Sequence, residues 1–201
     1  MVRAPSNPRT LNLLLPPRLK LKISREDFIK LALANRNLRL ERTAEGELIV
    51  NPPTGWQTGE RNADMTYQLV KWVKELDGGG IAFDSSTGFT LPNGAERSPD
   101  ASWVSKERWN ELSPDQKVTF ANICPDFVIE LRSASDTLKT LQAKMQEYLE
   151  NGAKLGWLID PKNRRVEIYR QGQDVEVLDN PKTLSGENVL PGFVLNLEGI
   201  W

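Results

Sequence analysis

Apolar residues recur at helical spacing in three stretches of the chain, residues 24–35, 58–77 and 137–151. Spacings of three and four residues are typical of amphipathic helices that cover a core with one face. Ser24, with Asp27 three residues later, predicts the start of the first helix, and the glycines at 78–80 and 152 predict the ends of the other two. The apolar faces of the second and third helices comprise Met65, Leu69, Trp72, Val73 and Leu76, and Leu138, Leu141, Met145, Tyr148 and Leu149.

Short runs of apolar and β-branched residues, separated by turn residues, predict strands between these helices. The predicted strands are residues 38–41, 47–50, 81–84, 89–91, 98–104, 125–132, 155–159, 166–169 and 175–178. The first two flank Ala44-Glu45-Gly46 and should form a hairpin. Because helices and strands interleave, we expect an α/β protein of the α+β type, with a mixed central sheet flanked by helices.

The first 22 residues differ in composition from the rest of the chain. They are rich in proline and arginine, which predicts an extended arm that is disordered or docks on a partner subunit. Residues 23–201 should form a single domain. The apolar run 11–15 is too short for a signal-peptide core, and no run approaches the roughly 18 apolar residues that a membrane span needs. We therefore expect a cytoplasmic protein without a membrane partner.

The composition restricts the chemistry that this chain can perform. Its 201 residues include no histidine and one cysteine, and the net charge is −1. The commonest general base and metal ligand is thus absent, and multi-cysteine metal sites are excluded. Carboxylates and lysine remain, and their natural complement is a hard cation such as Mg²⁺. The near-neutral charge disfavours a broad basic surface for nucleic acid, although a local groove remains possible.

Among the acidic residues on predicted strands, Asp100 and Glu130 are the candidates for a shared site. Because side chains alternate along a strand, Glu130 shares one face with Asp126 and Arg132. If the two strands are neighbours, Asp100 and Glu130 can converge on one Mg²⁺, with Mn²⁺ as a substitute. The alternative is that both are solvated acids at strand ends.

Lys144 stands at the border of the apolar face of the third helix, beside Leu141 and Tyr148. A lysine in this position can extend its stem over the core and present its ammonium at the end of a strand. The alternative is a surface lysine with no role in a site.

Several motifs together resemble the Uma-type family of restriction-endonuclease-like proteins, within the PD-(D/E)xK nuclease superfamily. They are Arg97-Ser98-Pro99-Asp100, the segment Pro125-Asp126-Phe127-Val128-Ile129-Glu130-Leu131-Arg132-Ser133, then Lys144, Tyr148, Gly152, Trp157-Leu158-Ile159-Asp160-Pro161 and Val189-Leu190-Pro191-Gly192-Phe193. The resemblance covers about residues 24–201. It implies a restriction-endonuclease-like core and hydrolysis of DNA phosphodiester bonds.

The resemblance also implies roles for individual residues. Asp100 and Glu130 would bind Mg²⁺, and the lysine expected two residues after the acid is replaced by Arg132. A guanidinium stays protonated, so it cannot act as a base. The resemblance suggests that the lysine role has moved to the following helix, where Lys144 stands. The three catalytic residues are then Asp100, Glu130 and Lys144.

Further site residues follow from the same resemblance. Glu60 is the candidate for an additional metal-binding acid from the helix before the sheet, unless it only stabilises the first turn of that helix. Arg97 and Arg132 are candidates for phosphate contacts, unless they pair with Asp126. DNA in a local groove and a second copy of the chain, in a homodimer or higher homo-oligomer, are the expected partners.

Two other functions remain open. A catalytically silent, dimeric interaction protein that retains the nuclease fold would also fit the extended arm and Arg132. A metal-dependent phosphodiesterase acting on a small nucleotide would use the same site. The first differs from a nuclease in whether Asp100, Glu130 and Lys144 meet around a space the size of a cation.

Overall fold

The computed structural model describes residues 20–75, 79–118 and 120–201, so most of the predicted N-terminal arm lies outside the described residues. The helices are α1 (Arg25–Ala34), α2 (Trp56–Glu75), α3 (Lys106–Glu111), α4 (Pro114–Lys117) and α5 (Leu138–Glu150). The strands are β1 (Arg39–Arg42), β2 (Leu48–Asn51), β3 (Gly80–Asp84), β4 (Phe89–Thr90), β5 (Glu96–Arg97), β6 (Ala101–Ser105), β7 (Ala121–Asn122), β8 (Phe127–Leu131), β9 (Leu155–Asp160), β10 (Arg165–Arg170), β11 (Glu176–Asp179), β12 (Thr183–Ser185) and β13 (Val194–Asn196).

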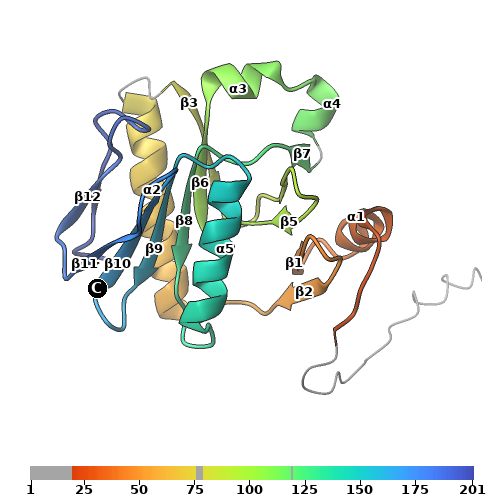
Figure 1. Cartoon of the computed structure of the whole chain (residues 1–201), viewed down its shortest axis with the longest axis horizontal. Helices are drawn as coiled ribbons and strands as arrows, with labels where there is room; N and C mark the ends of the chain where they lie inside the picture. The colour runs from red at the N-terminus through yellow and green to blue at the C-terminus, as the bar shows by residue number, and fades with distance from the viewer. Residues whose placement is uncertain (1–19, 76–78, 119) are drawn as a thin grey trace, which may run out of the picture.

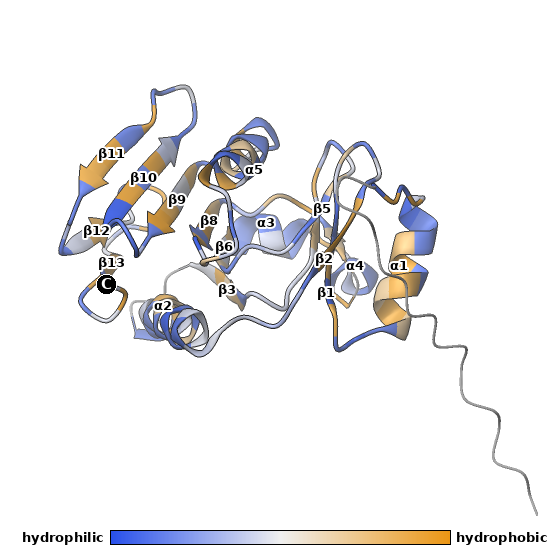
Figure 2. Cartoon of the chain, turned by 90° about the horizontal axis from the view of Figure 1, so that it is seen from below, coloured by the Kyte–Doolittle hydropathy of each residue, from blue (hydrophilic) through white to orange (hydrophobic). Residues whose placement is uncertain are grey.

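The central layer is a six-stranded mixed sheet in the order β11-β10-β9-β8-β6-β3. Strands β8 and β9 are parallel, and the other neighbours in this sheet are antiparallel. Helices α2 and α5 lie on opposite sides of it, as Figure 2 shows in a view along the layer. The mixed sheet flanked by helices confirms the fold class predicted from the sequence.

Alternation along β8 divides the core into two parts. Phe127 and Ile129 pack on the side of α2, against residues such as Leu69. Val128 packs on the opposite side, against Met145 of α5. Because Glu130 is two residues after Val128, its side chain is directed to the side of α5, as the period of two predicts.

The two strands that bear the acidic residues are neighbours, which is the condition for a site shared by Asp100 and Glu130. Ala101 of β6 pairs with Ile129 of β8 in antiparallel register, and the Asp100 amide donates to the Ile129 carbonyl at 3.0 Å. Asp100 immediately precedes β6, and Glu130 is near the end of β8. The antiparallel pairing therefore brings both residues to the same end of the sheet.

The N-terminal hairpin forms as predicted but belongs to a separate sheet. Strands β1 and β2 join β5, β4 and β7 in the order β2-β1-β5-β4-β7. This second sheet lies beside the central layer with α1 at its outer side (Figure 1). The short strands β5, β7, β12 and β13 were not predicted, since segments of two or three residues leave no recognisable period.

Two local observations complete the fold. Cys124 is buried in the core on the side of α5, and burial raises the pKa of its thiol to about 12. Among the helices in the described part of the chain, none combines the length and the apolar content that crossing a bilayer requires.

Candidate active site

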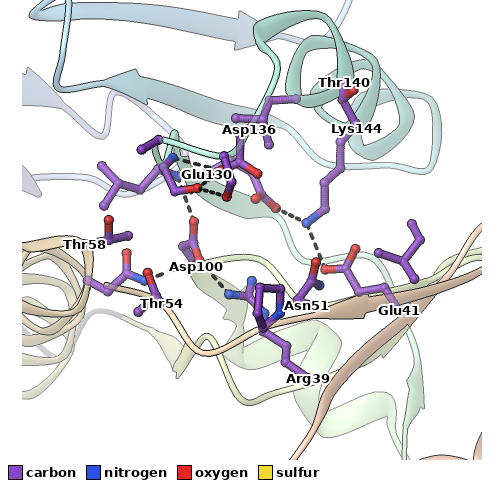
Figure 3. A pocket seen from close by; sticks show the side chains of 18 of the residues that line it. Arg39, Glu41, Asn51, Thr54, Thr58, Asp100, Glu130, Asp136, Thr140 and Lys144 are labelled. Carbon is purple, nitrogen blue, oxygen red and sulfur yellow. Dashed lines mark hydrogen bonds and ion pairs between the residues drawn. The ribbon is translucent and has the colours of Figure 1, made fainter. Parts of the chain in front are cut away.

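A cavity of about 840 Å³ lies where the central sheet meets the second sheet. Its wall includes Arg39 and Glu41 from β1, Asp100 and Glu130 from the central sheet, and Lys144 from α5. Figure 3 shows that these side chains point toward one another from their separate elements. The first turn of α2 and the loop before α5 also contribute to the wall.

The Asp100 carboxylate is held at the junction of β6 and β8. Its Oδ2 accepts the Leu131 backbone N–H at 2.8 Å, and its Oδ1 accepts from Arg39 Nη1 at 3.1 Å. Asn62 of α2 contacts the same Oδ1 through Nδ2 at 3.4 Å. Asp100 is buried, so its charge is compensated mainly by the Arg39 guanidinium.

The Glu130 carboxylate is deeper, with 2 % of the residue exposed. Its Oε1 accepts from the Tyr148 hydroxyl at 2.9 Å and lies 2.8 Å from Lys144 Nζ. Burial raises the pKa of Glu130 to about 7, and the negative charges of Asp100 and Glu41 act in the same direction against the Lys144 ammonium. The carboxyl group of Glu130 therefore loses its proton near neutral pH.

Lys144 reaches Glu130 from α5, as predicted from its place at the border of the apolar face. Its Nζ also lies 2.9 Å from Glu41 Oε1. Burial alone would lower the pKa of Lys144, but the carboxylates of Glu130 and Glu41 outweigh it and raise the pKa above its usual value. The two buried anions that face the ammonium therefore prevail over the effect of burial.

Glu41 is a site residue that the sequence did not reveal, as are Arg39 and Asn62. It is buried on β1, where it accepts from Lys144, from Arg97 Nη1 at 3.3 Å and from the Ser98 amide at 3.2 Å. Burial would raise the pKa of Glu41, but the positive charges of Lys144 and Arg97 prevail and lower it. An isolated acid in a charged strand of the second sheet gives no sequence signal that it belongs to this cavity.

Glu60 does not join this group. It is exposed on α2 and is not among the residues that line the cavity. The same helix contributes Asn62 instead, two residues later, whose Oδ1 is buried without a hydrogen-bond partner in the structure. The third acid near the pair is Glu41, from a strand rather than from a helix.

The two arginines have different surroundings. Arg97 lines the cavity but pairs with Glu147 Oε2 at 2.6 Å and with Glu41. Arg132 does not line it and binds Asp160 Oδ2 at 2.6 Å.

Neither arginine pairs with Asp126, so that alternative is wrong. Asp126 lies at the opposite end of β8 from Glu130. Its partners are Arg108 and Lys154, at 3.0 Å and 2.9 Å, and the Ser105 amide at 2.9 Å.

The site suits a metal ion that takes only some of its ligands from the protein. Within the described ranges, no three acids, cysteines or histidines converge into a preformed cage. Mg²⁺ commonly takes one or two carboxylates and completes its shell with water and substrate oxygens. Asp100 and Glu130 supply such a pair, and the unpaired Asn62 Oδ1 offers an acceptor for a bound water. The residues present therefore fit Mg²⁺. When no metal ion is bound, Arg39 compensates the charge of Asp100 and Lys144 that of Glu130.

Comparisons with known proteins identify the fold and the family of the chain. One solved structure, described as "a putative nuclease belonging to DUF820" from Anabaena variabilis ATCC 29413, matches with a TM-score of 0.68 and 24 % identity, over 80 % of this chain and 88 % of that chain. At this identity the match establishes the fold. No curated protein matches the chain. The model of the Uma2 family, described as "Putative restriction endonuclease", matches residues 25–198, so the chain belongs to this family of restriction-endonuclease-like nucleases.

Proposed function

We propose that this protein is a Mg²⁺-dependent endonuclease that hydrolyses DNA phosphodiester bonds, with Mn²⁺ as a possible substitute. One observation carries the proposal. Asp100 and Glu130, from adjacent strands, face one cavity in which Lys144 Nζ lies 2.8 Å from Glu130. A carboxylate pair with a neighbouring fixed ammonium is a constellation suited to phosphoryl chemistry.

Asp100 and Glu130 would hold the metal. When bound, Mg²⁺ would acidify a water molecule and neutralise charge on the phosphate. Glu130 can bind a cation only when ionised, and its pKa of about 7 delays that ionisation until the pH is neutral or higher. Asp100 is kept in place by the Leu131 amide, so its orientation does not depend on a bound ion.

Lys144 would stabilise negative charge that develops on the phosphate oxygens. Its raised pKa keeps it an ammonium, so it acts as a fixed positive charge and not as a proton acceptor. Glu41 holds Lys144 from the side opposite Glu130 and is a positioning residue in this scheme. Arg97 is the remaining candidate for a phosphate contact, because it lines the cavity, whereas Arg132 is held by Asp160.

The ends of two helices support an anionic substrate. Residues of the first turn of α2, and Thr140 in the first turn of α5, line the cavity. Neither helix has an acidic side chain in its first turn. The positive end of the helix dipole favours phosphate at such positions. Asp136, in the loop before α5, is occupied by the Ser133 amide and hydroxyl.

A cleavage assay tests this function. Supercoiled plasmid and labelled single-stranded and duplex oligonucleotides are incubated with the full chain in Mg²⁺, Mn²⁺ or EDTA. We expect cleavage with either metal and none in EDTA or with Asp100→Asn, which retains an acceptor for the Leu131 amide. Cleavage that Asp100→Asn does not reduce would contradict the assignment.

The same preparation separates the two alternatives. A folded protein that cleaves no nucleic acid with either metal, yet forms a stable dimer by light scattering, would favour the catalytically silent interaction protein. Hydrolysis of a small phosphodiester such as bis(p-nitrophenyl) phosphate, without cleavage of any oligonucleotide, would favour the small-nucleotide phosphodiesterase.

A further inference from the structure

Trp56 lines the cavity and has no role in the proposed chemistry. It is 95 % exposed, whereas Trp72, Trp103 and Trp157 are buried in the core. Tryptophan is highly buried on average in folded proteins, because its large ring gains much from leaving water. A fully exposed ring at the edge of a cavity is therefore suited to contact a bound molecule.

The position of Trp56 relates it to the candidate active site. It is the first residue of α2, follows Gly55 in the cavity wall, and precedes Asn62, the α2 residue that contacts Asp100. At a helical rise of about 1.5 Å per residue, Trp56 lies roughly 9 Å along the helix from Asn62. Stacked nucleotides of one strand are spaced by about 3.4 Å, so this offset equals two or three nucleotides.

The size and depth of the cavity indicate the form of the nucleic acid. Its volume of about 840 Å³ falls within the range of small-molecule sites, roughly 300–1,000 Å³. Asp100 and Glu130 are 6 % and 2 % exposed, so a phosphate must enter the cavity to reach them. A single strand or an extruded nucleotide can enter such a space with its base free to stack, whereas the bases of a continuous duplex stay paired inside the helix.

The charges also disfavour binding by the backbone alone. The cations in the cavity wall are Arg39, Arg97 and Lys144, and each is paired with a carboxylate. The whole chain has a net charge of −1. Affinity for duplex DNA depends strongly on free cations that displace counterions. With the cations of the cavity wall already paired, an aromatic surface that binds bases would supply affinity that phosphate contacts do not.

We propose that Trp56 stacks on an unpaired nucleobase near the phosphate in the cavity, so that the substrate class is single-stranded or locally unpaired DNA. The proposal rests on the proposed function of the same cavity. It adds a residue that selects the form of the DNA, separate from the carboxylates that would hold the metal.

Binding of a fluorescein-labelled 12-nucleotide DNA to the full chain in EDTA tests the proposal by fluorescence anisotropy. We expect Trp56→Ala to weaken binding of single-stranded DNA about tenfold, and Trp56→Phe to retain most of the affinity, because stacking needs only an aromatic face. Tyr67→Ala is the matched control. Tyr67 is an exposed aromatic residue of the same helix, 62 % exposed, outside the cavity wall. Its removal should leave the affinity unchanged.

A double-mutant cycle between protein and DNA identifies the contact. A series of oligonucleotides, each with one abasic site, is compared on wild-type protein and Trp56→Ala. We expect one or two positions where base removal weakens binding to wild type but not to Trp56→Ala.

Each outcome of the binding experiments decides the proposal. The proposal would be overturned if base removal and Trp56→Ala weakened binding additively at every position, or if wild type and Trp56→Ala bound with equal affinity. Trp56 would then be assigned to contact with a protein partner. Failure of wild type to bind any oligonucleotide would overturn it too. If the cycle shows coupling but the wild-type protein cleaves nothing, the stacking role stands and the proposed nuclease function fails.

Discussion

Lys144 Nζ joins Glu41 and Glu130, at 2.9 Å and 2.8 Å, although the two carboxylates belong to different sheets. Glu41 is on β1 of the second sheet and Glu130 on β8 of the central sheet. Both carboxylates are buried, so neither would be stable as an anion without a nearby cation. The Lys144 ammonium therefore links the two sheets at the cavity, and its two ion pairs fix its position.

Glu41→Gln tests whether this link positions Lys144. Glutamine retains the one acceptor oxygen that Lys144 and the Ser98 amide share, but it removes the charge and replaces the oxygen that accepts from Arg97. We expect kcat for cleavage to fall by about 10- to 100-fold, with KM for DNA nearly unchanged, and stability to fall by about 3 kcal/mol in urea titrations. Glu47→Gln is the control, since Glu47 also lines the cavity but pairs with the exposed Lys20. A kcat equal to that of wild type in Glu41→Gln would remove Glu41 from the site.

Exchanges between lysine and arginine test which cation serves the reaction. Arg132→Lys changes a side chain that binds Asp160 outside the cavity, so activity should stay within about tenfold, or about 1.4 kcal/mol of barrier. Lys144→Arg places a larger, planar group between Glu41 and Glu130 and should lose far more. The measurement is single-turnover cleavage with Mg²⁺, and the reverse order would assign the lysine role to Arg132.

Metal binding separates the carboxylates from the lysine. In calorimetric titrations with Mn²⁺, we expect Asp100→Ala and Glu130→Ala to abolish binding, since each removes one of two ligands. Lys144→Ala should retain binding, or strengthen it, because it removes a cation that competes for Glu130, while cleavage is lost. Mn²⁺ affinity that does not change in Glu130→Ala would disprove the proposed ligand pair.

The pH dependence follows from Glu130. Its pKa of about 7 means that the carboxyl group is mostly protonated below pH 7, where it cannot hold a cation. Mn²⁺ affinity should therefore rise about tenfold per pH unit below 7 and level off above it. Lys144 has a raised pKa and stays protonated over this range, so it adds no opposing step. Glu130→Gln should retain no such dependence, and an affinity of the wild type that is flat between pH 5.5 and 7.5 would contradict the assignment.

The same ionisation should lower stability as pH rises. The pKa of Glu130 is raised from 4.5 to about 7 on folding, so the folded state binds more protons between these values. The stabilisation from the protonated form is complete below about pH 4.5 and is lost as pH rises through about 7. In urea titrations in EDTA, the free energy of unfolding of the wild type should fall relative to that of Glu130→Gln as pH rises from 4.5 to about 7. Parallel pH profiles of the two proteins would contradict a raised pKa of Glu130.

The helices and the main strands could be predicted because they depend on local patterns. The period of two along β8 assigns Val128 and Glu130 to one face, and the period of α5 brings Lys144 to the border of its apolar face; the structure confirms both. Asp100 beside Glu130 required one further assumption, that the two strands pair, and the register of Ala101 with Ile129 bears it out.

The sequence by itself determined the helices, the main strands and the chemical types available: carboxylates and lysine without histidine. Only the tertiary structure decided which residues meet. Glu41 lies 103 residues before Lys144 and contacts it because the second sheet packs against the end of the first, while Glu60 remains exposed on α2. The protonation of Lys144 was likewise decided by the fold, since burial and two neighbouring anions act in opposite directions on its pKa. Such balances depend on distances and burial between remote segments, which no local pattern encodes.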